Sequence, residues 1–135
     1  MLKNISNLGD AALYCDFGVQ VNKATNLEVI KYFNTIREKK IKGVNNLTPS
    51  YNKLIISFDL RVTNFSEIKN KIENLDTTIE QNKNNKKIEV PVCCEENFAL
   101  DKSRLEKKLN LSYQEILTKF FDKEYFCYMT GFIAG

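Results

Sequence analysis

The 135-residue chain contains no histidine. Without an imidazole, the chain alone cannot build a Ser-His-Asp triad, a Cys-His nucleophile, an imidazole general base or a His-ligated zinc site. Any chemistry must therefore use carboxylates, lysines, thiols, the backbone or a partner protein.

The sequence also has little that would bind a membrane or a nucleic acid. No apolar run approaches the ~18 residues of a membrane span, and the N-terminus lacks the pattern of a secretion signal. The formal net charge is only +3, and the lysines are scattered among acids. We therefore expect a cytoplasmic protein without a membrane or nucleic-acid partner.

Familiar cofactor motifs are missing as well. The four cysteines form no C-x-x-C pair, and Cys93 and Cys94 are adjacent, so we expect reduced thiols and no metal site. Neither G-x-x-x-x-G-K-[ST] nor G-x-G-x-x-G occurs, which predicts no nucleotide site of either kind in this chain.

The first half of the chain predicts two strand pairs, each followed by a helix. Residues 3–7 and 11–17 predict a hairpin, and a capping box of Thr25 and Glu28 predicts a helix that ends near Gly43. A second pair of strands follows at 44–47 and 54–60, and the latter alternates with Leu54, Ile56, Phe58 and Leu60 on one face. Ser66 is expected to cap the next helix, whose apolar positions are Phe65, Ile68, Ile72, Leu75 and Ile79.

The second half begins with the polar linker 81–87 and an alternating strand at 88–92, where Pro91 indicates a sheet edge. Asp101 is expected to cap a helix through Leu109. A capping box of Ser112 and Glu115 opens a further helix, with an apolar side of Ile116, Leu117, Phe120 and Phe121. Residues 125–135 predict a last strand, apolar on both faces.

These elements predict an α+β fold: a two-layer sandwich with a mainly antiparallel sheet. Residues 1–80 form a β-β-α-β-β-α unit, and 88–135 form a β-α-α-β segment after the linker. A strand that is apolar on both faces must be covered on both. We therefore expect that the chain stops before a second domain and that the exposed apolar end favours self-association.

Several short pieces, in this order and spacing, resemble a known family: GDAAL at 9–13, PSY at 49–51 ahead of LII at 54–56 and Asp59, VPVC at 90–93, Asp101, LS at 111–112 with EI at 115–116, and YFCYMTGFIAG at 125–135. The family is that of the 5-oxoprolinase B subunit, also called allophanate hydrolase subunit 1, which includes the sporulation kinase inhibitor KipI. No piece is diagnostic alone, but together they span essentially the whole chain.

The resemblance implies the N-terminal domain of a subunit in a complex that hydrolyses 5-oxoproline to glutamate with ATP. ATP is implied for the full complex only, and the partners are companion oxoprolinase-type subunits and an absent C-terminal cyclophilin-like domain. The domain itself would have a structural and interface role. The alternatives are a KipI-like inhibitor of a sensor histidine kinase and an allophanate hydrolase subunit in urea breakdown.

The resemblance also points to four residues near the end of the chain as part of a ligand-binding or interdomain cleft. They are Tyr128, Gly131, Phe132 and Gly135. The alternative for them is a plain core strand, and no catalytic residue is assigned.

Two further groups have both a chemical and a structural interpretation. Glu95, Glu96 and Asp101 could bind a divalent metal or act as an acid/base pair, but a solvated loop with an N-cap is favoured. Cys93 and Cys94 could include a reactive thiol, but no basic residue adjoins them, which favours inert thiols. Asp10 and Asp16 are typical of turns and strand ends.

Overall fold

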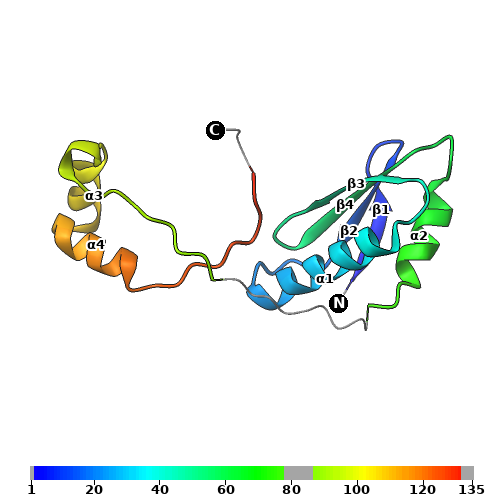
Figure 1. The fold of residues 1–135 in the computed structure, drawn as a ribbon, viewed down its shortest axis with the longest axis horizontal. Coiled ribbons are helices and arrows are strands. Elements are labelled where there is room, and N and C mark those ends of the chain that lie inside the picture. Colours follow the sequence, from blue (N-terminus) through cyan, green and yellow to red (C-terminus); the bar gives the residue numbers. More distant parts are fainter. Residues whose placement is uncertain (1, 78–86, 132–135) are drawn as a thin grey trace. The chain divides into compact units, whose positions relative to one another are not determined.

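The computed structural model describes residues 2–77 and 87–131 (Figure 1). The chain divides into two compact units, residues 1–82 with 127–135, and residues 83–126. None of the helices in the described ranges has the length and apolar character that a bilayer crossing requires.

The first unit contains a four-stranded sheet in the order β1-β2-β4-β3, with every neighbouring pair antiparallel. The strands are β1 (Asn4–Asn7), β2 (Ala12–Asp16), β3 (Val44–Pro49) and β4 (Lys53–Phe58). β2 and β3 run in the same direction with β4 between them, and helix α1 (Lys23–Lys39) connects them. The predicted α+β class and antiparallel sheet are confirmed.

One face of this sheet forms the core, because alternate residues of each strand point the same way. Cys15 pairs with both Ile5 and Leu54, so three neighbouring strands contribute to one apolar layer. Helices α1 and α2 (Phe65–Glu73) cover that layer with Val29, Ile36, Ile68 and Ile72. Each fully buried side chain of this size stabilises the fold by about 1.5–3 kcal/mol relative to an exposed one.

Both helices of the first unit begin earlier than predicted. Asn22, not Thr25, caps α1 by accepting a hydrogen bond from the Thr25 N–H at 2.9 Å. Asn64, not Ser66, caps α2 through the Glu67 N–H at 3.0 Å. Asparagine is as good an N-cap as serine or threonine. Asn22 and Asn64 both have an extended backbone conformation, as an N-cap requires, and therefore become the caps.

Strand β4 is shorter than predicted, and Leu60 is 57% exposed rather than part of the buried face. The strand stops because the next residue forms a turn: the Asp59 carbonyl accepts the N–H groups of Val62 and Thr63 at 3.0 and 3.1 Å. The Asp59 carboxylate also accepts the N–H of Arg61 at 2.9 Å.

The second unit contains a 3-10 turn, η1 (Glu96–Phe98), and helices α3 (Lys102–Leu109) and α4 (Tyr113–Phe121). The predicted capping box of Ser112 and Glu115 is confirmed. The predicted burial of Phe120 and Phe121 is wrong, since these side chains are 45% and 55% exposed. They contact each other edge to face at 5.2 Å instead, and among the described residues of this unit no side chain is fully buried.

Two predicted strands are absent from the described residues. Residues 88–92 are not a strand, and Ile88 and Val90 are 75% and 72% exposed. Residues 125–131 are not a strand either. A strand requires a neighbour that pairs with its backbone, and the alternation in these segments specifies none. Residues 81–86 of the predicted linker, and Ile79, lie outside the described residues.

We expect Gly43→Ala to destabilise the first unit by about 2–5 kcal/mol, because two penalties add. Gly43 has φ +93°, and a Cβ there would lie 2.5 Å from the Thr63 Cγ2 atom. Thr63 is buried and cannot easily move. Urea unfolding would measure the loss.

Gly9→Ala is the matched control, because Gly9 also has a positive φ but its Cβ would meet no atom within 4 Å. We expect it to cost about 1–2 kcal/mol. Thr63→Ser removes the clashing methyl group and should recover part of the Gly43→Ala loss. Equal losses in the two glycine variants would contradict the steric explanation.

Candidate functional site

Polar contacts gather at the end of the sheet where β3 turns into β4, at residues 50–52. The first turns of α1 lie against this turn, and residues 127–131 contact it from the far end of the chain. We call the five residues that make these contacts the docking joint: Asn26, Ser50, Tyr51, Tyr128 and Met129.

Asn26 is the centre of the docking joint. Its side chain is 1% exposed, and its amide nitrogen donates to three backbone carbonyls. These belong to Ser50 at 3.0 Å, Tyr51 at 2.9 Å and Tyr128 at 2.9 Å. A buried carbonyl without a donor costs about 1–3 kcal/mol. The two N–H bonds of one side chain thus link α1 to two segments that are distant in sequence, the β3–β4 turn and Tyr128.

Tyr128 and Met129 add side-chain contacts to the same joint. The Tyr128 ring lies 5.9 Å from the Tyr51 ring, centroid to centroid, and the Ser50 hydroxyl contacts the Met129 sulfur at 3.6 Å. Tyr128 is half-buried. Of the predicted cleft residues, the structure therefore brings Tyr128 to a packed site on the first unit.

The structure describes only one of the other three predicted cleft residues, Gly131, which makes none of the joint's contacts. Gly131 is exposed, and Phe132 and Gly135 lie outside the described residues. Asn26 was not predicted from the sequence, although a signal was present. Asn26 lies three and ten positions before the buried Val29 and Ile36, in phase with the core face of the helix, where an amide is unusual.

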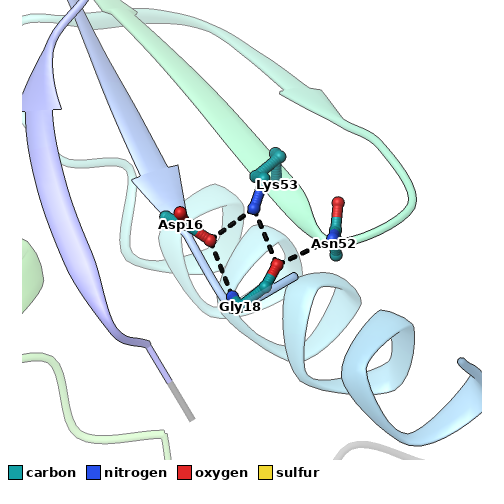
Figure 2. Close-up of polar contacts among 4 residues, drawn as sticks. All are labelled: Asp16, Gly18, Asn52 and Lys53. Carbon is teal, nitrogen blue, oxygen red and sulfur yellow. Dashed lines mark hydrogen bonds and ion pairs between the residues drawn. The ribbon is translucent and has the colours of Figure 1, made fainter. Parts of the chain in front are cut away.

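A second polar cluster lies at the end of β2, beside the same turn (Figure 2). The Asp16 carboxylate accepts the Gly18 N–H at 2.7 Å and forms an ion pair with Lys53. Lys53 and Asn52 both donate to the Gly18 carbonyl at 2.7 Å. The hydrogen bond from Lys53, aided by the Gly18 N–H, holds the pKa of Asp16 below its ordinary value.

This cluster fixes the loop that leaves β2. The Phe17 N–H also donates to the Asn52 carbonyl at 3.1 Å, so the loop is bonded to the turn from both sides. The interpretation of Asp16 as a strand-end residue is confirmed. The carboxylate acts as an acceptor that closes the loop, and its partners leave it ionised at neutral pH.

Two of the three acidic residues singled out in the second unit form surface ion pairs, and no ion pair of the third, Glu95, is found among the described residues. Glu96 binds Lys102 at 2.7 Å, and Asp101 binds Arg104 at 3.1 Å. Asp101 precedes α3, as predicted, but its side chain makes no capping hydrogen bond. Within residues 2–77 and 87–131, no three His, Cys, Asp or Glu side chains are grouped so as to hold a metal ion.

The thiols are unpaired and differ in environment. Cys15 lies in the core, and desolvation there raises its pKa to about 12. Cys93 is exposed, while the Cys94 sulfur contacts the Val92 carbonyl at 3.7 Å. A thiol with a raised pKa is a poor nucleophile at neutral pH. Cys15 is therefore a packing residue.

The groups at this end of the sheet are suited to docking. An amide, an ammonium and a carboxylate satisfy backbone groups of neighbouring segments and one another. None of them is paired with a nucleophile in the described contacts. The arrangement links Tyr128 and Met129 to the first unit through Asn26 and Ser50.

Comparison with known proteins shows one family over nearly the whole chain. Residues 3–135 match the family described as carboxyltransferase domain, subdomain C and D. The chain is 27% identical to the 5-oxoprolinase B subunit of Bacillus subtilis over 97% of its own length, and it spans 60% of that protein. A conserved uncharacterized protein of Pyrococcus horikoshii has a similar fold, with a TM-score of 0.52, 21% identity, and coverage of 89% of this chain and 56% of that one.

We expect Asn26→Asp to lower the free energy of unfolding by about 2–4 kcal/mol, because a carboxylate would face three carbonyls that have lost their donor. Urea unfolding would measure this. Hydrogen exchange of residues 127–131 should also accelerate, since one of the lost bonds holds Tyr128. Asn7→Asp, the same change at an exposed position, should stay within about 0.5 kcal/mol of the unmodified protein. An Asn26→Asp variant of unchanged stability would refute the role of the amide.

Asp16→Asn should weaken the protein in a pH-dependent way. The folded pKa of Asp16 is lowered, so its contribution is present above the unfolded pKa of ~3.9 and is lost as pH falls through the folded pKa. We expect a deficit of about 0.5–1 kcal/mol at pH 7 that disappears at lower pH. Unfolding curves across this range would test it, with Asp10→Asn as an exposed control. A deficit that persists unchanged in acid would contradict the assignment.

Proposed function

The chain belongs to the family of the carboxyltransferase domain, subdomain C and D, and from this membership we propose that it acts as part of a protein like the B subunit of 5-oxoprolinase. The observation that carries the proposal is the alignment with that protein, which extends over 97% of the chain. In this proposal the complete complex uses ATP to hydrolyse 5-oxoproline to glutamate in the cytoplasm.

Within such a complex, we assign this chain a structural and interface role. Its sequence has neither familiar phosphate-binding loop, so the nucleotide would bind to another part of the complex. The polar groups of the docking joint are bonded to one another, which supports positioning rather than proton transfer. The reacting groups would come from companion subunits or from a C-terminal domain.

The docking joint gives this role a structural basis. Residues 127–131 are held on the first unit through the Tyr128 carbonyl and the Met129 sulfur. In the proposed subunit, these residues lead toward the second domain. The joint would therefore fix the direction in which that domain is attached.

The test is reconstitution with the companion oxoprolinase subunits. We expect the subunit that contains residues 1–135 to co-purify with them, and release of glutamate from 5-oxoproline to require both the subunit and ATP. Asn26→Asp in that subunit should reduce turnover by about tenfold or more if the joint positions the complex, whereas Asn7→Asp, at an exposed position outside the joint, should not. Full activity in a complex that lacks residues 1–135 would refute the proposal.

The same preparation separates the rival functions. Inhibition of sensor histidine kinase autophosphorylation, without any glutamate release, would replace the proposal by a KipI-like regulatory function. Release of ammonia from allophanate, with no turnover of 5-oxoproline, would assign the complex to urea breakdown. Fold similarity alone does not distinguish the three.

A further inference from the structure

A hollow of about 480 Å³ lies where α1 and α2 end, and its lining is rich in lysine. We call it the lysine hollow; its four basic residues are Lys39, Lys40, Lys42 and Lys71. The half-buried apolar side chains of Ile41 and Leu75 lie between them. The basic groups come from two helices and the loop after α1, so the fold brings them together.

These lysines have no acidic partner in the described part of the chain. The ion pairs there involve other lysines, and Glu73, at the end of α2, pairs with Lys69 at 3.8 Å. Glu38 is the one acid within residues 36–43. Four like charges around one concave surface repel one another, so a bound anion would stabilise this surface.

A purely structural role explains only part of the cluster. Lys39 and Lys71 lie in the last turns of their helices, where cations interact favourably with the helix dipole. Lys40 and Lys42 lie beyond the last helical residue of α1. Lys40 also adopts a left-handed conformation with φ 45°, which glycine would adopt at lower cost.

A second hollow, of about 410 Å³, adjoins the first, since Lys40 and Ile41 line both. It extends between α1 and β3, an edge strand of the sheet, and its lining combines five apolar side chains, among them Phe33 and Leu47, with four polar or basic ones. Arg37, stacked over Phe33 at 5.1 Å, extends the positive charge along it. The two hollows together form a basic and apolar track.

We propose that this track binds an acidic segment of a protein partner. Carboxylates would contact the lysine hollow, and apolar side chains of the same segment would lie against Phe33 and Leu47. A small phosphate compound would use the lysine end alone, whereas an extended segment uses both hollows. The track itself is inferred from the structure alone. Only the identification of the partner as a companion subunit rests on the proposed function.

The test measures binding of a fluorescent peptide of repeated Glu-Glu-Leu units to the full chain. Replacing all four lysines of the hollow with glutamine should weaken binding by about tenfold or more. The control replaces Lys107, Lys108, Lys119 and Lys123, which are exposed and lie outside the hollow. It removes the same charge and should change the affinity less than about twofold. Affinity should fall as salt is raised.

A second measurement leaves the protein unchanged and replaces each leucine of the peptide with serine. Weaker binding of the serine peptide is expected, because the apolar hollow would lose its ligand. Equal losses in the lysine variant and its control would overturn the proposal. Competition by inorganic triphosphate would also overturn it. If triphosphate displaces the peptide and its own binding depends on the same four lysines, the track is a site for small anions.

Failure here and failure of the proposed function give different results. The peptide assay needs no companion subunit, so an absence of peptide binding overturns the track and leaves the oxoprolinase proposal standing. Conversely, the peptide could bind while oxoprolinase subunits fail to co-purify. That result would support the track as a binding site but refute the proposal that its partner is an oxoprolinase subunit.

Discussion

The single apolar face of the four-stranded sheet is the constraint on which the first unit depends. Because Leu13, Leu54 and Ile56 all point to this face, α1 and α2 must lie over it. Packing through Val29 and Ile36 fixes the rotation of α1 about its axis. That rotation turns Asn26 toward the β3–β4 turn, and the far end of the helix, about 20 Å away, brings its lysines beside α2.

Local signals predicted local structure well. The alternation of β4 and the capping box at Ser112 depend on residues a few positions apart, and both are present. The starts of α1 and α2 were misplaced because several competent caps stand close together. The strand predicted at 88–92 is absent for another reason. Alternating apolar residues indicate which face of a strand would be buried, but a strand also needs a neighbouring strand that pairs with its backbone, and the segment's own sequence does not specify that neighbour.

The candidate site was only partly predictable for the same physical reason. Tyr128 could be selected by resemblance, but its hydrogen bond with Asn26 is made by its backbone carbonyl, an atom that every residue has. Asn26 was visible only as an amide in phase with an apolar face. What the chain offers at this site is precise positioning of distant segments, which fits a protein that contributes surfaces to a larger assembly.

The burial of Cys15 has a consequence for following the motions of this protein. Its thiol sits between β1 and β4 in register with Ile5 and Leu54, so a thiol reagent reaches it only after the strands separate. Cys93 is exposed and reacts without such opening. The ratio of the two labelling rates in one sample therefore reports how often the sheet opens, with the protein carrying its own internal standard.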